Sequence, residues 1–88
     1  MANCYVWLNI EPEGLPKMSS IMFIGKEPEC IEWVRRATYK QSISPKIHHE
    51  LRDGFYFRNK PEKIHCRLTA GEGETRIERN FNITMNYK

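Results

Sequence analysis

The sequence predicts an α+β domain built on one mostly antiparallel sheet of about five strands, in the order β-β-α-α-β-β-β, with one long helix and one short helix on one face. Two observations predict this class. Several short segments alternate between apolar and polar residues, as strands do, and two segments between them carry helix-start signals and helical periodicity. A length of 88 residues fits a single compact domain over 1–88.

The first expected strand covers residues 4–11, where the sequence alternates with period two. On one side lie Cys4, Val6, Leu8 and Ile10, and on the other lie Tyr5, Trp7 and Asn9. This pattern predicts a half-buried strand. After a turn at 12–17, the apolar segment 20–24 predicts a second strand that pairs back on the first. Two alternatives for its inward side stay open: Ile21 with Phe23, or Met22 with Ile24.

Two helices are expected in the middle of the chain. The first should cover about 28–41, because Pro28 suits a first helical turn and acidic residues precede basic ones, as the helix dipole favours. Its inward stripe would consist of Cys30, Val34, Ala37 and Thr38. A second helix of two turns should start at Ser44-Pro45, a capping residue followed by a first-turn proline, and stop at Gly54.

Three strands are expected in the C-terminal part. The first covers 55–58. The second covers 64–69, where Ile64, Cys66 and Leu68 alternate with polar residues. A loop with two glycines then leads to the last strand, 77–87, whose apolar side is interrupted only by Arg79.

Two helices can cover only one face of such a sheet, so the other face should contact solvent. The covered face should hold Val6, Leu8, Phe57, Leu68, Phe81 and Ile83. The open face should hold Tyr5, Trp7, Asn9, Tyr56, Arg58, His65, Arg67, Asn80, Asn82 and Thr84. This mixture of aromatic, basic and amide side chains is typical of surfaces that bind other proteins and of sheets on which unpaired bases stack. The alternative is that the aromatic rings only pack against a loop or pair across strands.

The net charge of +3 is mild, but its distribution along the chain is uneven. Residues 33–60 carry seven basic and two acidic residues, and the remainder of the chain sums to −2. This basic mid-chain region could attract phosphates or an acidic protein surface. The simpler interpretation is a solvated helix surface.

The sequence offers little for catalysis or cofactor binding. Cys4, Cys30 and Cys66 are an odd number at wide spacing, which favours free thiols in a reducing compartment over a disulfide framework. His48-His49 and His65 lack the spacing of a metal site, and no nucleotide-binding or nucleophile motif occurs. We therefore expect no cofactor, no metal and no catalytic residue. Since no leader or long apolar run is apparent, a cytoplasmic protein without membrane contact is expected.

The leading functional hypothesis is a small non-enzymatic protein that docks a macromolecular partner through the open face and the basic mid-chain region. The expected binding residues are Tyr5, Trp7, Arg35, Arg36, Tyr56, Arg58, His65 and Arg67. A protein or a protein–nucleic-acid complex is the expected partner. Proteins of this kind include phage inhibitors and regulators of host defence or nucleic-acid machinery, such as anti-CRISPR proteins.

Two alternatives stay open. The first is a module that binds single-stranded RNA or DNA. The second is a toxin-type ribonuclease, because small bacterial toxins of this class are basic, are similar in size and also place two helices before an antiparallel sheet. In that case Arg58, His65, Arg67 and Tyr87 would be the active residues. A homodimer, formed through a sheet edge such as the last strand or through the sheet face, is a further expectation.

Overall fold

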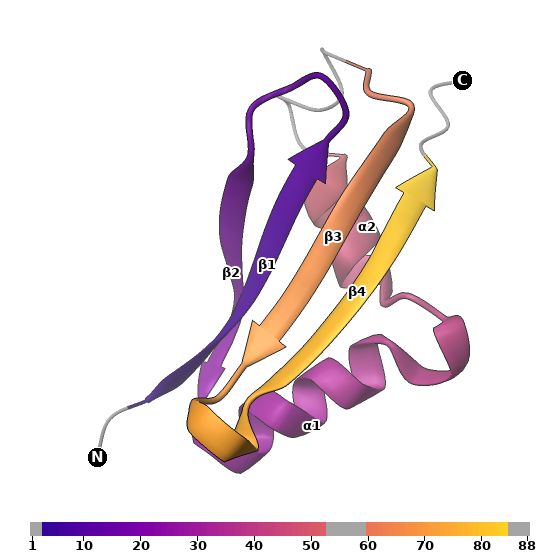
Figure 1. Cartoon of the computed structure of the whole chain (residues 1–88). Coiled ribbons are helices and arrows are strands. Elements are labelled where there is room, and N and C mark those ends of the chain that lie inside the picture. Colours follow the sequence, from indigo (N-terminus) through magenta and orange to yellow (C-terminus); the bar gives the residue numbers. More distant parts are fainter. Residues whose placement is uncertain (1–2, 53–59, 85–88) are drawn as a thin grey trace.

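The computed structural model describes residues 3–52 and 60–84, and it shows one antiparallel sheet of four strands with two helices on one face (Figure 1). The strands are β1 (Cys4–Pro12), β2 (Met18–Gly25), β3 (Lys63–Ala70) and β4 (Ile77–Thr84). The helices are α1 (Glu27–Ala37) and α2 (Pro45–Leu51), and short 3₁₀ turns cover Tyr39–Gln41 and Gly73–Thr75. In the sheet the strands lie in the order β2-β1-β3-β4.

The predicted α+β class and the antiparallel sheet are confirmed, and within the described residues the sheet has four strands where about five were predicted. The elements of the described residues follow the order β-β-α-α-β-β. The strand expected over 55–58 lies outside the described residues, and so does the end of the last strand after Thr84.

The first helix is shorter than predicted. Helix α1 ends at Ala37 after 11 residues, whereas its periodicity had predicted a helix to about residue 41. The hydroxyl of Thr38 donates a hydrogen bond to the carbonyl oxygen of Val34 at 2.8 Å, and Thr38 itself has φ −126°. Lys40 then adopts a left-handed φ of 49°. A local side-chain bond and one positive φ therefore end the helix where the sequence pattern would have let it continue.

Both helices begin within one residue of the predicted start, α1 at Glu27 and α2 at Pro45. At α1, the backbone N–H of Lys26 donates to Oε1 of Glu29 at 3.0 Å, and the acidic residues of the first turn complement the helix dipole. At α2, the hydroxyl oxygen of Ser44 accepts from the backbone N–H of Lys46 at 3.3 Å, with Pro45 as the first helical residue. None of the helices in residues 3–52 and 60–84 is long and apolar enough to cross a membrane.

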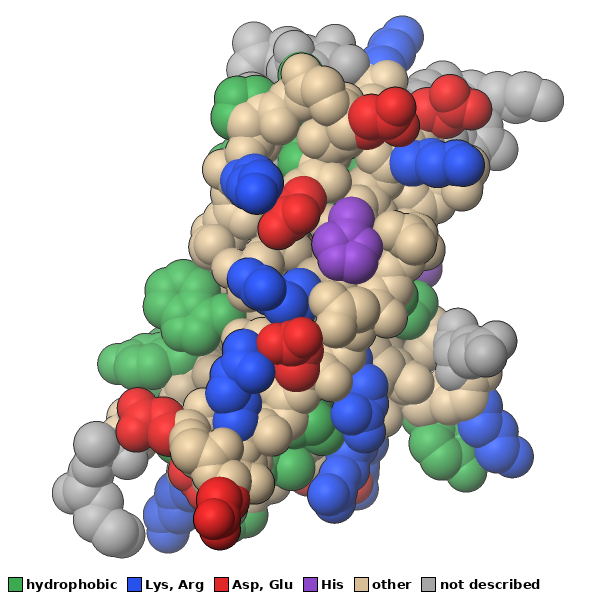
Figure 2. Space-filling model, in the orientation of Figure 1, with side chains coloured by type: hydrophobic (Ala, Val, Ile, Leu, Met, Phe, Trp, Pro, Cys, Tyr) green, Lys and Arg blue, Asp and Glu red, His purple; other side chains and the backbone are tan. Residues whose placement is uncertain are grey.

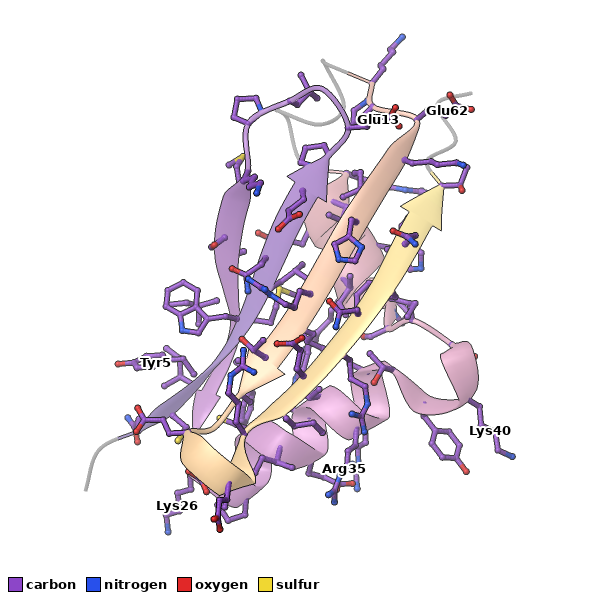
Figure 3. All side chains as sticks on the ribbon, in the orientation of Figure 1. Tyr5, Glu13, Lys26, Arg35, Lys40 and Glu62 are labelled. Carbon is purple, nitrogen blue, oxygen red and sulfur yellow. The ribbon has the colours of Figure 1, made fainter. Side chains whose placement is uncertain are left out.

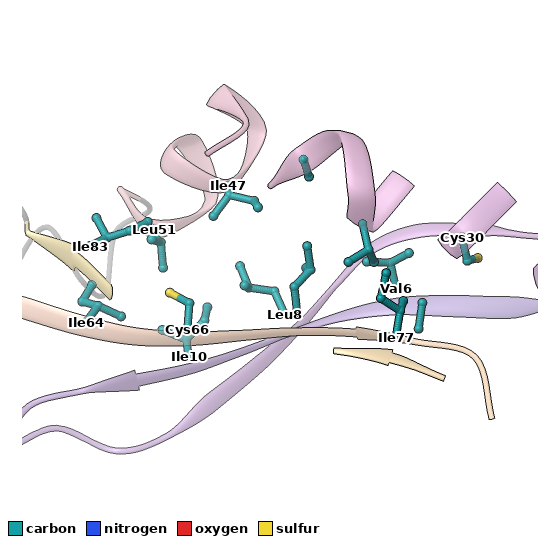
Figure 4. Packing of buried hydrophobic residues seen from close by; sticks show 14 residues of the cluster. Val6, Leu8, Ile10, Cys30, Ile47, Leu51, Ile64, Cys66, Ile77 and Ile83 are labelled. Atoms are coloured by element: carbon teal, nitrogen blue, oxygen red, sulfur yellow. The ribbon is translucent and has the colours of Figure 1, made fainter. Parts of the chain in front are cut away.

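The core lies between the sheet and the two helices (Figure 4). Strand β1 contributes Val6, Leu8 and Ile10, and helix α2 contributes Ile47 and Leu51. The other buried apolar residues are Cys30, Val34, Ala37, Ile64, Cys66, Leu68, Ala70, Ile77 and Ile83. The predicted helix-facing side is thus confirmed for Val6, Leu8, Leu68 and Ile83, while Phe81 is half-buried and Phe57 lies outside the described residues.

A β-bulge in β2 resolves the orientation that the sequence left open. The pairing of β1 with β2 joins Val6 to Phe23 and Trp7 to Ile21, so Met22 is the extra residue. Met22 and Phe23 both pack against the core, whereas Ile21 and Ile24 are exposed. Neither of the two alternatives was right, because a bulge breaks the strict alternation on which both depended.

Leu8 offers a direct test of this core. Its side chain is fully buried on a central strand, so Leu8→Ala should lower the free energy of unfolding by about 2–5 kcal/mol. The matched control is Leu15→Ala in the half-buried turn between β1 and β2, for which a loss of about 1 kcal/mol is expected. Urea unfolding followed by circular dichroism measures both. Equal losses would contradict the described packing.

The buried thiol of Cys66 should make stability depend on pH in alkaline solution. Burial raises the pKa of this thiol from about 9 to about 12, because the thiolate would be desolvated in the core. In the unfolded chain Cys66 ionises from about pH 9, so its contribution to stability is complete below that pH and is lost as the pH rises toward 12.

The expected loss is at most about 1.4 kcal/mol per pH unit above pH 9. Urea unfolding of the reduced protein at several alkaline pH values measures it, and Cys66→Ala serves as the reference because other titrating groups are unchanged. The difference between the two proteins should shrink as the pH rises. A constant difference would show that Cys66 ionises equally easily in both states.

Candidate functional site

The face of the sheet opposite the helices carries polar and aromatic side chains in cross-strand rows (Figure 2). The rows follow from the register of β1, β3 and β4: Trp7–Thr69–Glu78, Asn9–Arg67–Asn80 and Glu11–His65–Asn82. Figure 2 shows hydrophobic side chains at one margin of this face and charged side chains and a histidine across its middle. We call this surface the open face.

At one margin of the open face lies an apolar corner, which consists of Tyr5, Trp7, Ile21 and Ile24. Their exposed fractions are 44%, 40%, 44% and 52%. The register places Ile21 opposite Trp7 and Ile24 opposite Tyr5, so all four belong to the same side of the β1–β2 ladder. The rings of Tyr5 and Trp7 are tilted by 49° with centroids 6.4 Å apart. Figure 3 shows Tyr5 projecting from the sheet margin.

A small hollow adjoins the apolar corner. It has a volume of about 190 Å³ and lies between the start of β1 and the end of β3. Tyr5, Trp7, Thr69 and Glu72 are among its lining residues. A hollow of this size next to two aromatic rings can accept a side chain of a partner.

The middle of the open face is a network of amides and one imidazole. Nδ2 of Asn9 donates to the carbonyl oxygen of Arg67 at 3.4 Å, and the hydroxyl of Ser19 donates to Oδ1 of Asn9 at 2.9 Å. His65 Nδ1 and Asn82 Oδ1 lie 3.0 Å apart. These contacts tie β2 to β1, β1 to β3, and β3 to β4, so the polar side chains are held in fixed positions.

Arg67 differs from the other polar residues of this network, because one of its side-chain donors has no hydrogen-bond partner among the described residues. Its residue is half-buried, and this donor, the Nε atom, is itself buried. A buried donor without a partner costs roughly 1–3 kcal/mol relative to a satisfied one.

The charges of the open face are mixed. The open face carries two acidic side chains, Glu11 and Glu78, and two basic ones, Lys63 and Arg67. Arg76 forms an ion pair with Glu78, with 2.9 Å between Nη2 and Oε1. The hydrogen bond from Asn80 Nδ2, at 3.1 Å, and then the contact with Arg76 hold the pKa of the Glu78 carboxyl below its ordinary value. The Glu78 carboxylate is thus ionised at neutral pH, and the face carries acidic as well as basic side chains.

The structure divides the predicted binding residues between the two layers. Tyr5, Trp7, His65 and Arg67 lie together on the open face. Arg35 and Arg36 are exposed on α1, in the helical layer behind the sheet, as Figure 3 shows for Arg35. Arg36 is paired there with Glu32, at 3.1 Å between Nε and Oε1. The remaining two predicted residues, Tyr56 and Arg58, lie outside the described residues.

The helical layer has a groove of its own. It has a volume of about 640 Å³ and lies between α1 and the segment that leads into α2. Trp33, Arg36, Ile43 and Lys46 are among its lining residues. Part of the basic mid-chain region therefore borders this groove and not the open face.

Sequence reasoning missed two members of the apolar corner, Ile21 and Ile24. The missing signal is the bulge at Met22, which shifts the inward positions by one residue in the middle of β2. The run of four apolar residues from Ile21 to Ile24 gives no sign of such a shift in the sequence.

The described residues hold few features that suggest catalysis. In residues 3–52 and 60–84, no three His, Cys, Asp or Glu side chains are grouped so that they could hold a metal ion. Of the four residues of the ribonuclease alternative, His65 and Arg67 share the open face, whereas Arg58 and Tyr87 lie outside the described residues.

Comparisons of the chain with protein-family models, with curated proteins and with solved structures gave no match. The candidate function therefore depends on the geometry of the open face alone.

The role of Asn80 in the open face can be tested by titration. Because its hydrogen bond is the largest cause of the lowered pKa of Glu78, Asn80→Ala should raise that pKa toward the ordinary value. NMR titration of the Glu78 side-chain carboxyl carbon measures it. Asn82→Ala, two residues further along β4, should leave the pKa of Glu78 unchanged. The same shift in both variants would show that the Asn80 contact is not formed.

Proposed function

We propose that this protein acts by docking another protein on the open face of its sheet, without catalysing a reaction. The observation that carries the proposal is the combination, on one face, of an exposed apolar corner and a half-buried arginine, Arg67, whose Nε has no hydrogen-bond partner in residues 3–52 and 60–84. Aromatic residues and arginine are the residues that contribute most to binding energy in protein interfaces. The fixed amide network between them supplies a preorganised surface.

The apolar corner would bind an apolar side chain of the partner. Tyr5 and Trp7 flank the hollow of about 190 Å³, so an aliphatic or aromatic side chain inserted there would contact both rings. Exposed aromatic rings in this arrangement lose little conformational entropy on binding, since each has only two rotatable side-chain bonds. This contact would supply most of the affinity.

Arg67 would bind a carboxylate of the same partner. A guanidinium offers two parallel donors to a carboxylate. The row of Arg67 is two residues along β1 from the row of Trp7, which corresponds to about 7 Å along the strands. The partner should therefore present an acidic side chain at about that distance from an apolar one.

The distribution of charge favours a protein over a nucleic acid. Glu11 and Glu78 are on the open face, where they would repel phosphates. The basic residues Arg35, Arg36 and Lys46 are on the helical layer. A single strand whose bases stacked on Tyr5 and Trp7 would meet these carboxylates as well as the cations Lys63 and Arg67, so its phosphates would gain little net attraction. The partner itself is a separate prediction. We expect it to belong to a defence or nucleic-acid-processing complex that the bound protein inhibits or regulates.

Two matched pairs of variants test the proposal. Tyr5→Ala and Arg67→Gln alter the open face, and Tyr39→Ala and Arg35→Gln make the same changes on exposed residues of the helical side. A partner is first recovered by affinity purification with the unaltered protein, and its affinity for each variant is then measured by calorimetry. We expect losses of about tenfold or more for the open-face variants and less than about twofold for the controls.

Three outcomes would overturn the proposal. The first is equal loss in both members of each pair, with folds verified by circular dichroism. The second is an interaction that only the helical-layer variants weaken. The third is binding of single-stranded oligonucleotides at about 50 mM salt that weakens steeply with added salt and is lost in Tyr5→Ala, which would assign the open face to nucleic acid.

A further inference from the structure

The geometry of the β2 edge points to a second interaction surface, and we propose that it pairs with β2 of a second copy of this chain. The two strands would run antiparallel about a two-fold axis, and the two sheets would become continuous. This inference does not depend on the proposed docking function, because it rests on the edge of the sheet, although the two surfaces share Ile21 and Ile24 of the apolar corner.

Strand β2 is one edge of the sheet that the described residues form. In the strand order β2-β1-β3-β4 it pairs with β1 alone within residues 3–52 and 60–84. Natural proteins usually protect such edges with charged side chains, proline or bulges. The eight residues from Met18 to Gly25 include no charged residue and no proline, and the bulge at Met22 is the one such device in the strand.

The opposite edge of the sheet is different. Strand β4 is also an edge within residues 3–52 and 60–84, as was expected for the last strand. It carries Glu78 and Arg79 next to each other, and Asn80 and Asn82 are exposed beside them. These side chains oppose pairing with another copy, because they would have to be desolvated or placed opposite like charges. Edge pairing is therefore favoured at β2 and not at β4.

Exposed apolar side chains are concentrated on the same strand. Among the described residues, half of the six large hydrophobic side chains that are exposed belong to β2: Met18, Ile21 and Ile24. Met18 pairs with Ile10 on the core side, whereas Ile21 and Ile24 lie on the open face. Exposed apolar surface on a soluble protein often marks an interface, and a second strand laid along β2 would cover Ile21 and Ile24.

The occupant is a second copy because β2 is complementary to itself. Its lack of charge means that two copies can align without like charges facing each other along the strand. The bulge then selects the register. Ile21 and Ile24 belong to the open face, whereas Met22 and Phe23 both face the core side.

Among the antiparallel registers that pair six or more residues of β2, one places every paired residue opposite a residue of the same side. It pairs Ile21 with Ile24 of the second copy and Met22 with Phe23 of the second copy, so the axis passes between Met22 and Phe23. Ser20 then faces Gly25, and Lys26 faces Ser19. A shift by one residue in either direction would place an open-face isoleucine opposite a core-side residue.

In this dimer both open faces point the same way, since paired residues keep their side of the sheet. The two apolar corners meet at the axis. Ile21 and Ile24 of the two copies cover one another, while Tyr5 and Trp7 of each copy remain exposed to solvent. If the docking function also holds, the dimer would present two docking surfaces to its partner side by side.

The first experiment measures mass in solution. Light scattering and sedimentation of the full chain should give twice the monomer mass of 10.5 kDa at high concentration, with dissociation on dilution. Ile21→Lys and Ile24→Lys should weaken association at least tenfold, because two lysines would be brought close to the axis. Asn82→Lys makes the same addition of charge on the open face of the other edge, and should leave the dimer intact.

The second experiment tests the register. In a mixed sample of labelled and unlabelled protein, filtered NMR spectra should show intermolecular contacts between the methyl groups of Ile21 and Ile24, which face each other at about 5 Å between Cβ atoms. Contacts from Ile21 to itself, or to β4, would overturn the proposed pairing.

A monomeric mass at all concentrations up to about 1 mM would also overturn the proposal. The β2 edge would then be a binding surface for a different protein. A dimer that Asn82→Lys breaks and Ile21→Lys does not would overturn the proposal too. Tyr5→Ala separates this surface from the docking site, because it should weaken partner binding and leave the mass of the dimer unchanged.

Discussion

The pairing of β1 with β3 is the constraint on which the rest of the structure depends. These two central strands lie far apart in the chain, and each buries alternate residues against the helices: Val6 and Leu8 on one, Cys66 and Leu68 on the other. The same register places Trp7 opposite Thr69 and Asn9 opposite Arg67 on the other side. A slip of one residue would exchange the two faces. The core therefore determines which side chains the open face displays.

Much of this arrangement could be predicted from local patterns. The alternation in 4–11, 64–69 and the last strand gave the correct inward sides, because a half-buried strand has a period of two wherever no bulge intervenes. The end of α1 could not be predicted, since it depends on one hydrogen bond from Thr38 and one positive φ at Lys40. The inward side of β2 could not be predicted either, because the bulge follows from its pairing with β1.

The residues of the candidate site also fall into those that the sequence predicted and those that it did not. Tyr5, Trp7, His65 and Arg67 were found through strand parity, which fixes the face of each residue. Arg35 and Arg36 were grouped with them through the charge of the chain, and charge along a sequence carries no information about which layer a residue joins. Ile21 and Ile24 were missed for the reason already given for β2. A surface assembled from several strands is thus predictable only where each strand is regular.

The long separation between β1 and β3 also shapes how the chain must fold. Asn9 and Arg67 are 58 residues apart, whereas β1 with β2 and β3 with β4 are neighbouring strands joined by short turns. Each hairpin can close at a small loss of chain entropy, but the two can join only after the intervening helical segment has been spanned. Until then β1 and β3 each expose an apolar, unpaired side. The step that completes the core is therefore also the step during which a crowded solution offers the greatest risk of association between incomplete chains.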